Sequence, residues 1–106
     1  MSTRPKHVVP ILGSADDLRG QYIVVTTARS EYHLSDGVCF GVRNRATGRW
    51  SHPHPAQGMR VTGYLTRNQG RTFRSHDLVM GVRLLFENQI STTPVDGWFC
   101  GEREVA

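Results

Sequence analysis

The sequence predicts an all-β fold, a small single-domain barrel or sandwich of about six to eight short, mostly antiparallel strands. Short runs rich in β-branched and aromatic residues recur along the chain, and clusters of Gly, Pro, Asn and Asp separate them. The length of 106 residues is near the commonest domain size. We therefore expect a single β domain at residues 14–101, an N-terminal tail or edge strand at residues 1–13 and a C-terminal tail at residues 102–106.

One short helical turn is expected near residues 14–20. Ser14 can cap its first turn, and Gly20 can end it in the left-handed conformation. The first main strand should follow at residues 22–28. This run is rich in β-branched residues and apolar on both faces, which favours a central position in a sheet.

The next two strands should form a hairpin. Residues 31–34 alternate between polar and apolar side chains, and the Asp36-Gly37 pair that follows is a strong signal for a two-residue turn. The return strand should cover residues 38–43. Its alternation predicts that Phe40 points inward, together with the valines two positions to either side.

The middle of the chain has the pattern of two further hairpins. A loop at residues 44–48 leads to a short return strand at residues 49–51. Residues 52–55 should form a loop or an edge crossing, because each of their two prolines lacks a backbone donor. A strand is then expected at residues 58–66, followed by a glycine-containing turn and a return strand at residues 71–74.

The last third contains the most apolar stretch, which predicts a strand at residues 78–86. Residues 90–95 should form an edge or bulged strand, because Pro94 interrupts them. The Asp96-Gly97 pair predicts another turn, after which residues 98–100 should complete the core. Most connections are short, so we expect a meander order.

Composition limits the class of protein. No apolar run reaches the roughly 18 residues that a transmembrane helix needs, and no signal-peptide core is evident, so a cytoplasmic location is expected. In that compartment Cys39 and Cys100 should be free thiols, and both lie in apolar strand patterns. No cofactor is expected.

The feature that indicates a partner is a stretch at residues 43–76, called here the acid-free segment. It contains seven of the thirteen basic residues and none of the nine acidic ones. Its arginines are Arg43, Arg45, Arg49, Arg60, Arg67, Arg71 and Arg74. Trp50 and Tyr64 lie among them and are candidate stacking residues.

This pattern predicts a non-catalytic binding module for an acidic partner, with nucleic acid as the favoured one. Arginine matches phosphate with a planar fork of donors, and exposed rings can stack on bases. If the hairpin tips near residues 44–48 and 68–70 lie side by side, the arginines form one positive rim. The simpler interpretation is a solvated surface, on which the arginines pair with carboxylates from other strands and the aromatic residues belong to the core.

Two alternatives remain open from the sequence. The first is a protein-interaction or assembly module of the small β-barrel type, which meets an acidic protein surface or recruits a strand onto an open edge. The second is a small metal-binding protein that uses His52 and His54, whose spacing places both rings on one side of an extended chain. The pairs of closely spaced ligands that are typical of structural zinc sites are missing. No hydrolase, metalloprotease or phosphate-loop motif is present either, so the sequence argues against an enzyme.

Overall fold

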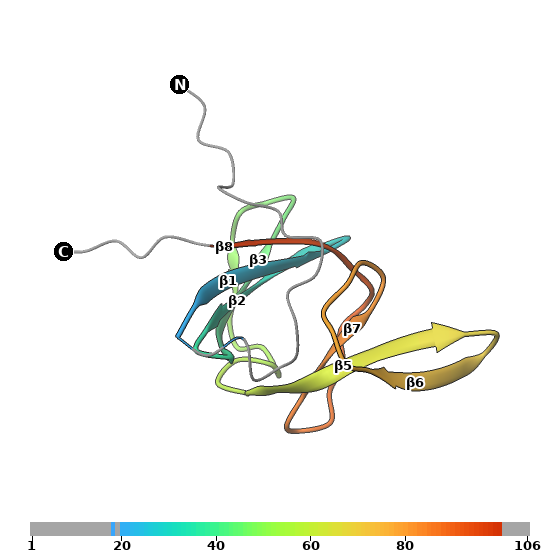
Figure 1. Ribbon diagram of the computed structural model, residues 1–106. Helices are drawn as coiled ribbons and strands as arrows, with labels where there is room; N and C mark the ends of the chain where they lie inside the picture. Colours follow the sequence, from blue (N-terminus) through green and yellow to red (C-terminus); the bar gives the residue numbers. More distant parts are fainter. Residues whose placement is uncertain (1–17, 19, 101–106) are drawn as a thin grey trace.

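The computed structural model describes Leu18 and residues 20–100, and it has the all-β fold that the sequence predicts. Eight strands form two antiparallel sheets that face each other, as a sandwich rather than a closed barrel (Figure 1). Both predicted tails and most of the predicted helical turn lie outside the described residues.

The larger sheet, called sheet A, has five strands. In spatial order they are β4 (Trp50–Ser51), β3 (Val38–Asn44), β2 (Ser30–Ser35), β1 (Tyr22–Thr27) and β8 (Val95–Cys100). The smaller sheet, sheet B, has three strands. In spatial order they are β6 (Arg71–Ser75), β5 (Val61–Asn68) and β7 (Arg83–Phe86).

The tight turns form where the sequence predicts them. Asp36 and Gly37 both have positive φ angles, 55° and 81°, and connect β2 to β3. Gln69 and Gly70, with φ angles of 51° and 78°, connect β5 to β6 in the same way. Two successive positive φ angles are the signature of the hairpin turn whose twist matches that of the strands.

The chain departs from a simple meander after β4. The first four strands follow one another across sheet A, but β5 begins sheet B and β8 returns to pair with β1. Backbone hydrogen bonds join the two sheets at two places. At one the Val61 amide donates to the Gly37 carbonyl at 2.8 Å, and at the other the Val95 amide donates to the Val82 carbonyl at 2.7 Å.

Two strand predictions in the last third are wrong. Of residues 78–86 only β7 is a strand. The preceding segment is a loop that buries Leu78 and Val82 in the core, and Gly81 breaks the extended chain with a φ of 90°. Residues 90–94 form no strand, although Ser91 makes a single bridge with Leu85, and Val95 is already the first residue of β8.

The predicted turn at residues 96–97 is also wrong, because both residues lie inside β8. Gly97 pairs with Thr26, and the register shifts at the next residue of β1. Here the Asp-Gly pair therefore lies at a register shift within a sheet. Glycine is also common at β-bulges.

The core lies between the sheets. Sheet A contributes Ile23, Val25, Tyr32, Leu34, Cys39, Val42, Val95 and Trp98, and sheet B contributes Val61, Tyr64, Leu84 and Phe86. Leu18, Ala56, Leu78 and Val82 complete it from the connecting segments. The outer half of the β5–β6 hairpin extends beyond this core, as Figure 1 shows. We call this projecting part, residues 65–75, the arm.

Candidate nucleic-acid interface

The arginines of the acid-free segment do not form one rim. The β3–β4 loop belongs to sheet A, whereas the β5–β6 turn lies at the end of the arm in sheet B. Figure 1 shows the two hairpin ends pointing in different directions from the body of the protein. The expectation that their tips lie side by side is therefore wrong, and the two groups of arginines have to be considered separately.

Arg45, in the β3–β4 loop, is a structural cross-link. Its Nη1 donates to the Thr27 carbonyl at 2.6 Å and lies 2.9 Å from Oδ2 of Asp96. The other carboxylate oxygen of Asp96 accepts a 2.6 Å hydrogen bond from the Thr26 hydroxyl. The Thr26 hydrogen bond, followed by Arg45, holds the pKa of Asp96 below its usual range. Arg45 thus ties its loop to β1 and β8.

Arg43 is similarly engaged on the outer face of sheet A. Its Nε donates to the Gly48 carbonyl at 2.8 Å, and its Nη1 lies 3.9 Å from Oε1 of Glu31. The guanidinium carbon lies 6.0 Å from the centre of the Trp50 ring, within cation–π range. These contacts tie Arg43 to its own loop and to β2, while its side chain remains 44% exposed.

The two remaining arginines of the acid-free segment outside the arm, Arg60 and Arg49, differ from each other in their contacts. The Arg60 Nη1 donates to the Asp36 carbonyl at 3.1 Å, and its backbone amide donates to a carboxylate oxygen of Glu87 at 2.9 Å. Arg49 is exposed in the β3–β4 loop. Glu31 and Asp96 thus lie beside the side chains of Arg43 and Arg45, as the simpler interpretation of the sequence expected. Glu87 contacts only the backbone amide of Arg60.

Trp50 remains available as a stacking platform, whereas Tyr64 does not. Trp50 is 52% exposed, but Tyr64 is completely buried in the core. The prediction that Tyr64 is an exposed stacking residue is therefore wrong, because its face of β5 points between the sheets. The exposed aromatic residue of sheet B is Phe73 on β6, which is 47% exposed.

The Trp50 ring packs against β3 at Gly41. A Cβ added to Gly41 would approach Cζ3 of the Trp50 ring to 2.7 Å, so this glycine is what permits the contact. Phe40, 46% exposed, lies nearby on the same surface and contacts the His33 ring. Its predicted inward orientation is wrong, because a bulge in the β2–β3 ladder leaves it outside while Cys39 enters the core.

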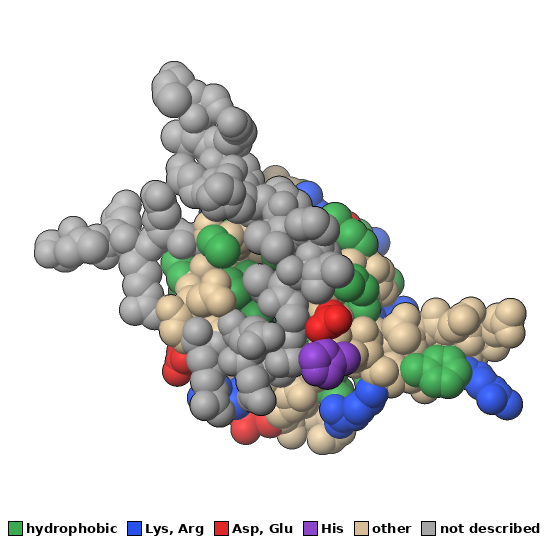
Figure 2. Space-filling view, viewed as in Figure 1, with side chains coloured by type: hydrophobic (Ala, Val, Ile, Leu, Met, Phe, Trp, Pro, Cys, Tyr) green, Lys and Arg blue, Asp and Glu red, His purple; other side chains and the backbone are tan. Residues whose placement is uncertain are grey.

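The arginines of the arm carry charge that no carboxylate of the described residues neutralises. Arg67, Arg71 and Arg74 are exposed, and none forms an ion pair with any residue that the structure describes. Phe73 pairs with Thr66 across the arm, one position from Arg74. Figure 2 shows an exposed hydrophobic side chain on the arm, a basic side chain near its end, and no acidic side chain there on this face.

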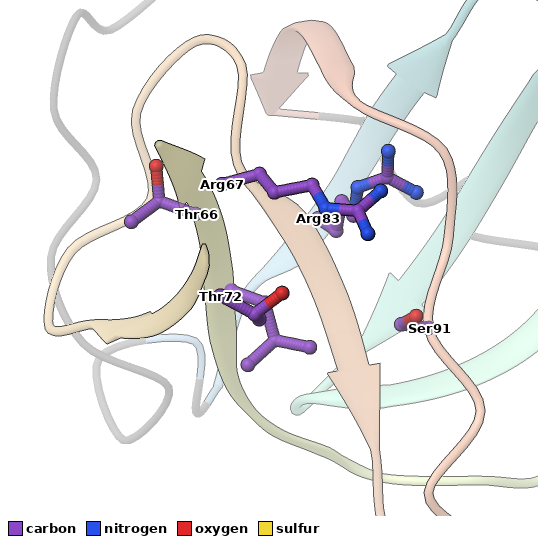
Figure 3. Close-up of a pocket in the computed structure, with 6 residues that line it drawn as sticks. Thr66, Arg67, Thr72, Arg83 and Ser91 are labelled. Carbon is purple, nitrogen blue, oxygen red and sulfur yellow. The ribbon is translucent and has the colours of Figure 1, made fainter. Parts of the chain in front are cut away.

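Sheet B adds one arginine that the sequence analysis missed. Leu65 pairs with Arg74 on one side and with Arg83 on the other, so the two arginines flank it on one face of the sheet. Arg67 follows two residues later on that face. A hollow of about 220 Å³ is lined by Leu65, Thr66, Arg67, Thr72, Arg83 and Ser91 (Figure 3). Arg83 lies outside the acid-free segment, and only the β5–β7 register reveals its position.

The two histidines of the metal alternative contact other groups. His52 Nδ1 lies 3.0 Å from the Gln57 side-chain oxygen, and His54 Nδ1 accepts from the Ala56 amide at 3.0 Å. The His54 ring packs edge-on against Tyr32, and its burial lowers the pKa of the imidazole. Within Leu18 and residues 20–100, no three His, Cys, Asp or Glu side chains come close enough together to hold a metal ion.

Cys39 and Cys100 are free thiols, as expected. Cys39 is buried, and burial raises the pKa of its thiol to about 11, which leaves almost no thiolate at neutral pH. In the described part of the chain, no helix is both long and apolar enough to cross a membrane.

Comparisons of this chain with protein-family models, curated proteins and solved structures gave no match. The fold and the candidate interface together describe a basic β-sandwich with a projecting, arginine-rich hairpin.

Proposed function

We propose that this protein is a non-catalytic nucleic-acid-binding module that holds a single strand along the β5–β6 arm. The observation that supports the proposal is the charge of the arm. Its three arginines are exposed and form no ion pair with the described residues, whereas the carboxylates of Glu31 and Asp96 lie beside arginines of sheet A. Counterions that condense on a phosphate backbone are released when such cations replace them, which favours binding.

The arm also has the second element that a single-strand site requires. Phe73 presents an aromatic ring that is 47% exposed, adjacent in sequence to Arg74. An unpaired base can stack on such a ring, and each stacked base contributes ~1–3 kcal/mol. Bases inside a duplex are already stacked on each other, so an exposed ring on a basic arm favours a single strand.

The proposal can be tested by fluorescence anisotropy with a labelled single-stranded oligonucleotide of about 15 nucleotides, titrated at several salt concentrations. The double variant Arg71→Gln/Arg74→Gln should bind about tenfold more weakly at low salt. The slope of log affinity against log salt should become shallower by about 1.4, because each lost phosphate contact accounts for about 0.7 with single strands.

The matched control is Arg29→Gln/Arg49→Gln. It also removes two exposed charges, but from sheet A and its loops. If the two double variants lose affinity equally, binding depends only on net charge and the arm is not the site. Failure of the unmodified protein to bind the oligonucleotide at low salt would exclude the proposal altogether.

A second candidate function is protein interaction, and a different surface favours it. Phe40 and Trp50 are both about half exposed and line a hollow of about 310 Å³ with Gly41, Ser51, His52 and Gln57. Exposed tryptophan in a pocket is typical of the residues that dominate protein interfaces. Trp50→Ala should then abolish capture of a protein partner while leaving oligonucleotide affinity within about twofold, because Trp50 lies on sheet A and not on the arm.

A further inference from the structure

The hollow at the base of the arm has a chemistry of its own. Arg67 extends over it from β5 and Arg83 from β7, and Figure 3 shows both side chains on the same face of the sheet. Thr72 and Ser91 line the remaining sides, each with a hydroxyl group in its side chain. Within the described residues the lining contains no carboxylate, so its charged groups are two cations.

Arg83 makes one long hydrogen bond beside the hollow. It is only partly exposed, and its Nη1 donates to the Thr92 carbonyl at 3.4 Å. Thr92 is itself fixed, because it is buried and its hydroxyl accepts from the Leu84 amide at 3.0 Å and donates to the Thr93 carbonyl at 2.7 Å. A guanidinium with five donors that uses one in this way keeps the others free for a ligand. It also loses less side-chain freedom on binding.

The strand register places Arg67 and Arg83 near each other on one face of the sheet. Arg83 pairs with Leu65, and Arg67 is two residues further along β5, so the two arginines are diagonal neighbours on one face. Like charges that are close together across a sheet destabilise it. A bound anion between the two guanidinium groups would reverse the sign of that interaction.

The space and the donors both suit a tetrahedral oxyanion. A volume of about 220 Å³ exceeds that of several water molecules, each of which occupies about 30 Å³ in the liquid. Guanidinium forks match the spacing of phosphate oxygens, and hydroxyl groups can donate to those that remain.

We propose that the Arg67–Arg83 hollow is a phosphate-binding pocket. The inference deepens the proposed function. It rests on that function in one respect, because the phosphate in the pocket would belong to the nucleic-acid strand that the arm binds. That phosphate is either a terminal monoester, whose double charge two guanidinium groups balance, or an internal diester.

The direct test uses inorganic phosphate as the probe and the amide signals of Thr72 and Ser91 in two-dimensional NMR as the readout. Both signals should shift on titration and saturate, with chloride at equal ionic strength as the comparison. Arg83→Gln should weaken phosphate binding about tenfold or more, since a hydrogen bond to a charged group is lost from a prearranged site. Arg67→Gln, which changes an exposed residue, tests the pocket independently should Arg83→Gln fail to fold. Arg29→Gln, remote from the pocket, should change the affinity less than twofold.

The source of the phosphate can be resolved with two oligonucleotides that differ only in a 5′-phosphate. Tighter binding of the phosphorylated strand, lost in Arg83→Gln, assigns the pocket to a strand end. Equal binding of both strands, weakened equally by Arg83→Gln, assigns it to an internal diester. The pocket is refuted if phosphate does not shift the Thr72 and Ser91 amides, or shifts them equally in Arg67→Gln. That result leaves the arm proposal standing, because the arm is tested through Arg71 and Arg74.

Discussion

The β3–β4 loop and the β5–β6 arm belong to the same acid-free segment, yet their arginines do different work. In the loop, Arg45 lies 2.9 Å from a carboxylate oxygen of Asp96, and Arg43 lies 3.9 Å from one of Glu31. On the arm, Arg67, Arg71 and Arg74 have no such partner among the described residues. Arg43 and Arg45 are cross-links, whereas the arginines of the arm are free charges among the described residues.

The difference shows that a stretch without acids in sequence need not be without acids in space. Antiparallel pairing places Glu31 of β2 opposite Arg43 of β3, and β8 brings Asp96 to the neighbouring loop. The arm extends beyond the strands that could deliver carboxylates in this way. Local charge therefore predicts a binding surface only where the chain leaves the body of the sandwich.

The largest expected effect concerns two aromatic residues of sheet B, one buried and one exposed. Tyr64→Ala should destabilise the fold by ~3–5 kcal/mol, because Tyr64 is fully buried and its truncation leaves a cavity. Phe73→Ala should change stability by less than about 0.5 kcal/mol, as for other surface positions. It should weaken oligonucleotide binding by about tenfold, because the stacking of one base is lost. Urea unfolding and anisotropy measure the two quantities. A stability loss above about 2 kcal/mol in Phe73→Ala would be typical of a core residue. It would show that the arm packs against the body of the sandwich.

The interpretation of Tyr64 also shows where sequence analysis reaches its limit. The sequence correctly predicted the strands on either side of Asp36-Gly37 and of residues 68–70, together with these two turns, since those signals are local. The same Asp-Gly signal failed at residues 96–97, which lie inside β8. Alternation did not reveal which face of β5 is covered, because that depends on β7 and sheet A. Nor could it place Phe40, because a single extra residue in the β2–β3 ladder reverses the orientation that alternation predicts.

Arg83 illustrates the same limit for the site. Its neighbours in sequence are Val82 and Leu84, both buried, so the local pattern indicates core. Only the pairing of Leu65 with Arg83 brings it to the arm. A register between strands about twenty residues apart follows from tertiary packing, which short-range patterns do not contain.

The next effect compares Gly41, which lies under the Trp50 ring, with Gly63, which lies under the end of the Arg74 side chain. A Cβ on Gly41 would lie 2.7 Å from the Trp50 ring, and one on Gly63 would lie 2.9 Å from Nη1 of Arg74. Gly41→Ala should destabilise the fold by ~1–3 kcal/mol, because a rigid ring has to move from its packed position. Gly63→Ala should change stability by less than about 0.5 kcal/mol, because the flexible end of Arg74 can move aside.

Urea unfolding of the two alanine variants gives this comparison directly, and tryptophan fluorescence should report the displaced ring in Gly41→Ala only. Equal destabilisation would show that Arg74 is held as firmly as Trp50. That outcome would contradict the description of the arm arginines as free charges.

The smallest effect concerns the cross-link in the loop. The Thr26 hydroxyl and then Arg45 lower the pKa of Asp96 in the folded state. A lowered pKa in the folded state stabilises the protein above the unfolded value of about 3.9, and this contribution disappears as the pH falls through the folded value. Both partners are nearly half exposed, with side-chain exposures of 41% for Arg45 and 49% for Asp96. Solvent screening therefore limits the contribution to ~0.2–1 kcal/mol.

Asp96→Asn should consequently be less stable than the unmodified protein at pH 6, and the gap should narrow as the pH falls below about 4. Arg71→Gln, which removes an unpaired charge from the arm, should show no such pH-dependent gap. Urea unfolding of the three proteins from pH 6 to pH 3 measures both curves. A constant gap for Asp96→Asn would show that this carboxylate is not held in its charged form by the fold. Arg45 would then be as free as the arginines of the arm, and the contrast between the two regions would rest on Arg43 alone.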